Sequence, residues 1–291
     1  MMKLLSYNIQ YGFGADGHYD LARAARVIAK ADIAAIQEVD RHWSRSDFDD
    51  QPALLQALLP DHFSAYAPGF DMDASFHLNG RIVNRRRQFG PMIFSRWPLI
   101  WTRTHLLPML RMIDPINTQT CALEACIATP MGAIRVMCLH LAHVGVEERL
   151  AQIAHLQSLQ LRSPAAGPPW SGTDDEPARN WTEGQAEPPF AASEVWMGDF
   201  NCEPGSQELA MLTAHTPYHP DARYAGGLVN ATTAVGAKLH THSKVIAGAR
   251  RLRQLDHMFV SPDLVGNISN VWSDVAEDAS DHYPLWMTFA R

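Results

Sequence analysis

The stretch Glu194-Val195-Trp196-Met197-Gly198-Asp199-Phe200-Asn201 indicates how this chain is built. Its apolar run, Val195 to Met197, predicts a buried strand, and Gly198 lets the backbone turn sharply after it. Because residues two apart face the same side of an extended backbone, Asp199 and Asn201 can point into one site. Asp and Asn are also ordinary turn residues, so a capping turn explains the stretch equally well when it is taken alone. A site is favoured because other apolar stretches of the chain end in the same way.

The composition bounds the class of the protein. Its 291 residues, 46% of them hydrophobic, fit one large α/β domain or two ordinary ones. The net charge of −7 argues against a partner held by broad attraction to phosphates, but leaves open a nuclease whose metal supplies local positive charge. No apolar run could cross a bilayer, and polar Asn8 and Gln10 come too early for a signal peptide. We therefore expect a soluble, cytoplasmic protein without membrane insertion, and the sequence indicates no protein partner.

The cysteines indicate neither a disulfide framework nor a zinc site. Four cysteines are too few for a disulfide scaffold in a chain this long, and none are spaced as CxxC. Cys126 and Cys138 lie in apolar runs and are expected to be buried. Cys202 directly follows Asn201, so it is either a reactive thiol beside the site or an ordinary buried one.

Two stretches near the N-terminus also end in polar side chains. Residues 2–9 predict a buried strand that brings Asn8 to its end, and residues 20–30 have the apolar spacing of a helix. Residues 32–36 predict a second strand, which hands over Gln37 and Glu38. A carboxylate buried without a partner is costly, so Glu38 is either a site residue or a salt-bridged or helix-capping glutamate.

The middle of the chain adds a histidine and a change of composition. Residues 121–129 and 133–140 predict a hairpin ending in His140, and residues 147–161 an amphipathic helix. From Arg162 to Ala192, prolines and glycines break the periodicity. We interpret this segment as an insertion near the site, either a lid or a substrate wall, with a mobile surface loop as the alternative. The arginine-rich run 81–87 is either a solvated face or a phosphate-binding one.

Two more helices and the remaining candidates complete the prediction. Residues 52–59 and 206–212 predict short helices, whereas residues 213–253 are irregular and form the most basic region. A strand is predicted over residues 255–260, with Asp256 at its beginning. Asp281 and His282 precede a last apolar strand over residues 285–289.

These candidates share a position at or beside strand ends, which is where α/β proteins place their sites. They are Asn8, Glu38, His140, Asp199, Asn201, Asp256, Asp281 and His282. Carboxylates and amides without cysteines are hard oxygen donors, which suit Mg²⁺ or Mn²⁺ rather than zinc. Two histidines beside such a cation are what hydrolysis of a phosphate ester requires, since one can take a proton from water while the other assists the phosphate or the leaving group.

Six of these stretches resemble, in order, the motifs of the endonuclease/exonuclease/phosphatase superfamily. They are Ser6-Tyr7-Asn8-Ile9, Ile36-Gln37-Glu38-Val39, Leu139-His140-Leu141, Gly198-Asp199-Phe200-Asn201, Leu255-Asp256-His257 and Ser280-Asp281-His282-Tyr283-Pro284-Leu285. The resemblance covers nearly the whole chain. It implies an α/β (α+β) fold, a four-layer α/β/β/α sandwich of two mixed sheets flanked by helices, as a single domain over residues 1–291 with the proline-rich insertion at about 162–192.

The resemblance also implies a divalent-metal phosphoesterase and a role for each candidate. Glu38 would be the principal metal ligand, with Asn8 and Asp281 completing the metal environment. His282 would be the general base, oriented by a hydrogen bond to Asp256. Asp199 and Asn201 would position the attacking water and a phosphate oxygen, and His140 would bind the phosphate or protonate the leaving oxygen.

The superfamily includes many substrates, so the fold does not decide which one is used. Abasic-site endonucleases of the superfamily carry a Thr-Lys pair after the glutamate, where this chain has Val39-Asp40. With His140, the chain is more similar to the branch of deoxyribonucleases and sphingomyelinases. The leading hypothesis is a Mg²⁺- or Mn²⁺-dependent phosphodiesterase acting on a small or lipid-derived phosphoester. The alternatives are a DNA or RNA endonuclease and a non-catalytic phosphate-binding module.

Overall fold

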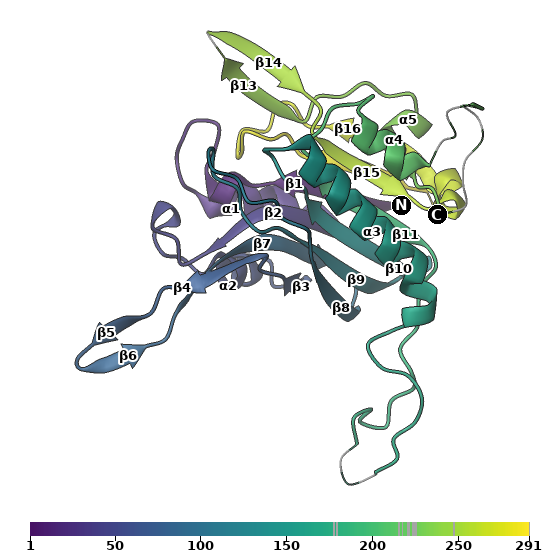
Figure 1. Ribbon diagram of the computed structural model, residues 1–291, viewed down its shortest axis with the longest axis horizontal. Helices are drawn as coiled ribbons and strands as arrows, with labels where there is room; N and C mark the ends of the chain where they lie inside the picture. The colour runs from purple at the N-terminus through teal and green to yellow at the C-terminus, as the bar shows by residue number, and fades with distance from the viewer. Residues whose placement is uncertain are drawn as a thin grey trace.

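Two mixed β-sheets form the centre of the computed structural model (Figure 1). The structure describes residues 1–290 except 177, 179, 215, 217, 220, 221, 223–225 and 247, so parts of the proline-rich segment and of the basic stretch 213–253 lie outside the described residues. The first sheet contains, in spatial order, β16 (Ile268–Ser273), β17 (Leu285–Phe289), β1 (Met2–Asn8), β2 (Ile33–Arg41), β7 (Arg86–Ser95) and β3 (Phe63–Tyr66), and β4 (Phe70–Asp73) also pairs with β7.

The second sheet contains, in spatial order, β12 (Val229–Asn230), β15 (Asp256–Val260), β11 (Glu194–Asp199), β10 (Gly132–His140), β9 (Cys121–Thr129) and β8 (Leu99–Leu106). Two further hairpins stand apart from these sheets, β5 (Phe76–Leu78) with β6 (Arg81–Val83), and β13 (His242–Ile246) with β14 (Ala249–Arg253). Each main sheet holds one parallel pair at its centre, β1 with β2 and β10 with β11, while the pairs around them are antiparallel.

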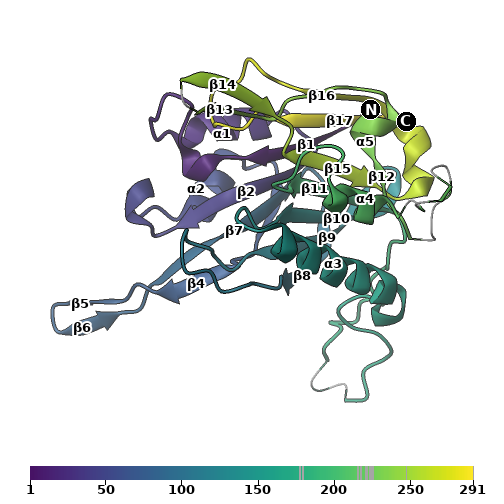
Figure 2. The same ribbon diagram turned by 45° about the horizontal axis from the view of Figure 1, so that its top comes forward.

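Three apolar layers show that the two sheets face each other and that helices cover their outer sides. Leu4 of β1 and Val195 of β11 belong to the same core between the sheets. Leu5 points the other way and packs with α1 (Leu21–Ile28) and α2 (Gln51–Leu58). Trp196 packs with α3 (Val146–Ala166) and α4 (Gln207–Thr213), which lie on the outer face of the second sheet (Figure 2). The period-2 alternation of the strands therefore produces the predicted four-layer sandwich.

The helices begin at the capping residues that the sequence supplies. Asp20 accepts a hydrogen bond from the Ala22 amide at the start of α1, and Asp50 accepts one from Ala53 at the start of α2. The short α5 (Ala231–Ala234) begins in the same way at Asn230. Helix α3 runs five residues beyond the predicted end at Leu161, through Pro164 to Ala166, so the first part of the expected insertion is helical.

Gly198 does not form the turn that the sequence suggested. It lies inside β11, paired with Leu139 and His257, and a Cβ atom there would stand 2.0 Å from the Leu139 carbonyl oxygen. The glycine is therefore required by the close approach of β10, and the backbone changes direction only at Asn201, whose φ is 52°.

Substituting Gly198→Ala should destabilise the protein by about 3 kcal/mol, because β10 and β11 must separate to admit the methyl group. The free energy of unfolding from urea titrations tests this. Gly266→Ala is the matched control, since no atom lies within 4 Å of its Cβ position. A variant at Gly198 as stable as the control would show that the strands can move apart without cost.

The proline-rich segment lies at the end of the second sheet opposite the strand ends that carry the candidates (Figure 1). It leads into Glu194, the first residue of β11, whereas Asp199 is the last. Its described part is fixed there by two hydrogen bonds, from Trp101 Nε1 to the Pro189 oxygen (3.0 Å) and from Arg135 Nε to the Ala191 oxygen (2.7 Å). The segment joins β11 at Glu194, and the candidate Asp199 lies at the other end of this extended strand. The expectation of a lid or substrate wall is therefore wrong.

Replacing residues 169–187 by a short glycine-serine linker should leave kcat and KM unchanged within about twofold, since the anchoring Pro189 and Ala191 are retained and loop tips tolerate change. Steady-state kinetics on two different phosphoesters test this. A changed ratio of kcat/KM between the two substrates would contradict the placement of the segment away from the site.

Some elements carry too weak an apolar pattern to be predicted. β8 and β16 were not expected, and β13 and β14 lie in the stretch expected to be irregular. β14 reads Ala-Arg-Arg-Leu-Arg and is mostly exposed, so it shows no alternation of apolar residues. Among the described residues, no helix combines the length and apolarity needed to cross a membrane.

Candidate active site

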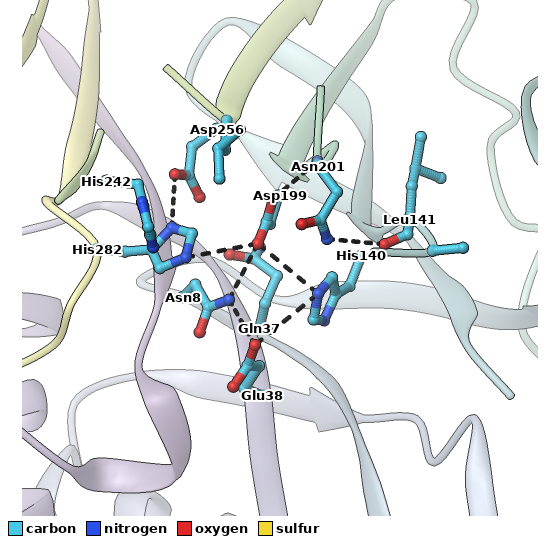
Figure 3. A network of polar contacts seen from close by, with 12 residues as sticks. Asn8, Gln37, Glu38, His140, Leu141, Asp199, Asn201, His242, Asp256 and His282 are labelled. Atoms are coloured by element: carbon cyan, nitrogen blue, oxygen red, sulfur yellow. Dashed lines mark hydrogen bonds and ion pairs between the residues drawn. The ribbon is translucent and has the colours of Figure 1, made fainter. Parts of the chain in front are cut away.

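Asn8 joins the carboxylates of the two sheets. It is fully buried at the end of β1, and its Nδ2 donates to Glu38 Oε1 (2.8 Å) and to Asp199 Oδ2 (3.1 Å). Its Oδ1 accepts a hydrogen bond from the Gln10 amide (3.0 Å). One amide thus holds a carboxylate from each sheet in a fixed position (Figure 3).

Glu38 does not stand at a strand end, as the sequence suggested, but on a bulge within β2. The pairing of β2 with β7 jumps from Ile36↔Met92 to Val39↔Gly90, so two residues of β2 lie opposite Pro91 alone. Pro91 has no amide hydrogen to donate to the ladder, and Glu38 takes a left-handed conformation with φ 61°. Such a conformation costs about 1–3 kcal/mol for a residue other than glycine, which is typical of functional sites.

Asp199 and Asn201 do point into one site, through the tight turn that ends β11. Asp199 is buried, and its Oδ1 accepts from the Asn201 amide (2.9 Å) while its Oδ2 faces the cluster. Asn201 Nδ2 donates to the Leu141 oxygen (2.9 Å), which fixes its side chain against the end of β10. His140, the last residue of β10, has Nε2 3.7 Å from Asp199 Oδ2 and 3.9 Å from Glu38 Oε1.

His282 is oriented by a buried carboxylate. Its Nδ1 lies 2.8 Å from Asp256 Oδ2, and its Nε2 lies 3.7 Å from Asp199 Oδ2 (Figure 3). Burial by itself would disfavour the imidazolium, but the negative charges of Asp256 and Asp199 outweigh it and raise the pKa of His282 to about 10. Ser280 fixes this loop, because its Oγ donates to the Asn8 oxygen (2.8 Å) and accepts from the His282 amide (3.1 Å).

Asp281 lies next to His242 and His282. Its Oδ2 is 3.7 Å from Nε2 of His242, and it groups with His242 and His282 rather than with Glu38 and Asp199. Burial would raise the pKa of Asp281, but the hydrogen bond from His242 and the nearby imidazole charges lower it. The structure therefore brings seven of the eight candidates into one contact network and connects Asp281 to it through His242 and His282.

A cavity of about 530 Å³ opens onto this network. One wall is aromatic, with the Arg45 guanidinium 3.7 Å from the ring centre of Tyr11 and 4.4 Å from that of Trp43. The charge of Arg45 is neutralised by Asp40, which accepts two hydrogen bonds from it (2.8 and 2.9 Å). A basic group, His242, Lys244 and Arg253, also lines the cavity.

Several residues of this site carry no signal in the sequence. His242 lies in a polar hairpin. Tyr11 and Arg45 lie in short 3-10 turns between strands and helices, and contacts with distant segments decide where these turns lie. Members of the arginine-rich run 81–87 are absent from the described lining of the cavity, and Arg86 pairs with Asp71 (2.8 Å). Cys202 is buried, which raises the pKa of its thiol to about 12 and agrees with an ordinary buried cysteine.

The donor set fits a divalent cation. Glu38 Oε2 is buried and finds no hydrogen-bond partner among the described residues, which is costly for a charged oxygen. A cation bound there would remove that cost, and the carboxylate oxygens of Glu38 and Asp199 are the hard donors that Mg²⁺ and Mn²⁺ prefer. The Asn8 amide presents its Nδ2 to both carboxylates, so its oxygen would become a ligand only if the amide turned over.

Residues 5–282 match the sequence model of the Endonuclease/Exonuclease/phosphatase family. The chain belongs to this family. Its members hydrolyse phosphoesters and generally use divalent metals, so the chain is a phosphoester hydrolase. No curated protein sequence matches the chain.

Solved structures share the fold at low sequence identity. A family protein from Leptotrichia buccalis C-1013-b is 17% identical, with both chains covered completely and a TM-score of 0.65. A mannosyl-6-phosphatase from Bacteroides thetaiotaomicron VPI-5482 is 16% identical, again over 100% of both chains, with a TM-score of 0.61. TDP2 from D. rerio, complexed with a single-strand DNA product, is 13% identical over 100% of this chain and 99% of that one, with a TM-score of 0.54. These similarities support the fold alone.

His257, beside Asp256, makes the stability of the family member depend on pH. It is fully buried, its Nε2 donates to the Cys202 oxygen (2.9 Å), and burial lowers its pKa from 6.5 to about 4. Below pH 6.5 the unfolded chain takes up a proton that the folded protein refuses, so stability is lost as the pH falls from 6.5 towards 4.

The decrease in the free energy of unfolding that is caused by His257 should approach about 3 kcal/mol at the acid end of this range. Urea unfolding at several pH values measures it, with His257→Gln as the variant that lacks the titration. The exposed His18 serves as control, since His18→Gln should keep the wild-type pH dependence. Equal slopes for wild type and His257→Gln would contradict the assignment.

Proposed function

We propose that the protein is a phosphodiesterase that uses Mg²⁺ or Mn²⁺ and acts on a small or lipid-derived phosphoester by in-line attack of water. The observation that carries the proposal is the placement of the His282–Asp256 pair directly beside the carboxylates of Glu38 and Asp199, which Asn8 Nδ2 holds together. A proton acceptor and a cation site that share one carboxylate are what hydrolysis of a phosphoester requires.

Each side chain has a role that its contacts support. Glu38 would hold a divalent cation, with Asn8 beside it, and the bound cation would supply positive charge that offsets the charge of the phosphate. His282 Nε2 takes the proton of the attacking water, while Asp256 fixes the ring and stabilises the imidazolium. Asp199 and Asn201 orient the water and a phosphate oxygen. His140 donates a hydrogen bond to the phosphate or a proton to the leaving oxygen.

Asp281 has a less direct part in this proposal than the family motif implies. Its contact with His242 places it next to the general base, from where it completes the negative environment of the metal site. We retain it as a contributor to that environment and assign the principal ligation to Glu38.

A substrate screen tests the proposal. Purified protein with Mg²⁺ or Mn²⁺ is offered phosphomonoesters, small phosphodiesters, lipid-derived phosphodiesters, plasmid DNA and single strands. We expect turnover of small or lipid-derived diesters, abolished by EDTA and weakly dependent on salt. Activity confined to nucleic acids, with a steep salt dependence, would instead identify an endonuclease. Binding of phosphate without turnover of any substrate would identify a binding module.

A further inference from the structure

The β13–β14 hairpin is held rigidly against the catalytic loop. The Thr241 oxygen accepts a hydrogen bond from the Tyr283 amide (2.6 Å), and Thr241 Oγ1 accepts from the Asp256 amide (2.9 Å). The Ser243 amide donates to the Asp281 oxygen (3.2 Å), and the ring centres of His242 and His282 are 4.7 Å apart. The side chains of the hairpin that face the cavity are therefore positioned relative to the general base.

The hairpin carries unneutralised positive charge. Lys244, Arg250, Arg251 and Arg253 make no ion pair with a carboxylate among the described residues. Lys244 lies directly opposite Arg251 in the register, and like charges in that arrangement destabilise a hairpin. In a chain with a net charge of −7, this concentration of cations requires an explanation.

Arg253 also has a donor that the protein leaves unused. Its NH2 group donates to His242 Nδ1 (3.3 Å), but its Nε is buried and has no hydrogen-bond partner among the described residues. Of the described cations that line the cavity, Arg45 is neutralised by Asp40, which leaves Lys244 and Arg253 to bind an anion. A phosphate bound between Lys244 and the guanidinium of Arg253 would offset the repulsion between Lys244 and Arg251.

We propose that Lys244, Arg251 and Arg253 form a subsite for a second phosphate group of the substrate, separate from the phosphate that is hydrolysed. This inference rests on the proposed function and narrows its substrate class to small phosphoesters that carry two phosphates. Arg45 stacked on Tyr11 and Trp43 in the lining of the same cavity offers an aromatic surface for the organic part of the substrate. A small molecule is favoured over a nucleic acid because the positive charge is local and the chain is acidic as a whole.

Two chromogenic esters that differ in one group test the subsite. They are thymidine 5′-(p-nitrophenyl phosphate) and the same ester with an additional 3′-phosphate. For the wild type we expect kcat/KM to be at least about tenfold higher for the 3′-phosphorylated ester, the effect of one or two charge-assisted hydrogen bonds. Lys244→Gln and Arg253→Gln should each bring the ratio of kcat/KM between the 3′-phosphorylated ester and the plain ester towards one.

Arg26→Gln is the matched control, since Arg26 is exposed on α1, carries the same charge and does not line the cavity. It should keep the wild-type ratio. Lys244 is exposed and its side chain makes no ion pair with another described residue, so its variant remains informative if Arg253→Gln fails to fold. A ratio near one in the wild type, or a ratio unchanged in both hairpin variants, would overturn the subsite.

A binding experiment separates failure of the subsite from failure of the proposed reaction. If neither ester is hydrolysed, calorimetry compares thymidine 3′,5′-bisphosphate with thymidine 5′-monophosphate. Tighter binding of the bisphosphate, lost in Lys244→Gln, would support the subsite even though the reaction had been misassigned. Equal affinities would reject it. Tighter binding of a single-stranded oligonucleotide, with a steep salt dependence, would reject the small substrate in favour of a nucleic acid.

Discussion

Glu38→Gln should lower metal-dependent turnover by at least about a thousandfold, because the neutral amide cannot replace the charge with which the carboxylate holds the cation. The same substitution should not destabilise the metal-free protein. Glu38 Oε2 is buried without a hydrogen-bond partner among the described residues, so removing its charge relieves a desolvation cost. The glutamine oxygen can still accept the hydrogen bond from Asn8 Nδ2.

Three measurements separate these effects. Single-turnover kinetics give the loss of rate, calorimetry with Mn²⁺ gives the loss of metal affinity, and urea unfolding of the metal-free protein gives stability. The exposed Glu147→Gln controls for the change of charge and should behave as wild type. Weakened Mn²⁺ binding with unchanged turnover would show that the cation bound at Glu38 is not the one that serves hydrolysis. Turnover and Mn²⁺ binding both near wild type would remove Glu38 from the site.

The sequence predicts this fold well because its strands alternate strictly. Val195 and Met197 face the core between the sheets while Trp196 faces α3, a division that follows from the period of the strand alone. Asn8, His140 and Asp199 end strands that belong to the two parallel pairs, β1 with β2 and β10 with β11, and the carboxyl ends of parallel strands meet at one edge of a sheet. The alternation can be found without knowing which strands are neighbours, whereas this convergence depends on the parallel pairing.

The features that the sequence missed depend on contacts between distant segments. The bulge that presents Glu38 depends on Pro91 of β7, which pairs with β2 across more than fifty residues. A glycine is needed at position 198 because the Leu139 oxygen of the neighbouring strand lies too close for a Cβ atom, and not because the chain turns there. His242 reaches the site on a hairpin whose charged, exposed residues carry no apolar period. Local sequence patterns therefore identify the candidate site residues, but they do not predict the backbone geometry that positions their side chains.

His282→Gln should lower kcat by about 10²–10⁴-fold, the usual contribution of a general base. The wild-type rate should also rise with pH above neutrality. The pKa of His282 is raised to about 10, mainly because the negative charges of Asp256 and Asp199 outweigh the effect of burial. In the metal-free protein the ring is therefore mostly an imidazolium at neutral pH, and the neutral fraction that can accept a proton grows as the pH approaches that pKa.

Asp256→Asn separates proton acceptance by His282 from the stabilisation of its imidazolium by Asp256. Loss of the neighbouring charge lowers the pKa of His282, so the rise of kcat/KM with pH moves to lower pH while the maximal rate falls, because the imidazolium is no longer stabilised. NMR titration of the His282 ring in the metal-free protein measures the pKa directly, and pH–rate profiles measure its consequence. A wild-type rate that falls between pH 7 and the alkaline limit, or a His282→Gln variant within tenfold of wild type, would assign proton transfer to another group. His140 is the next candidate, because its Nε2 lies 3.7 Å from the same Asp199 oxygen.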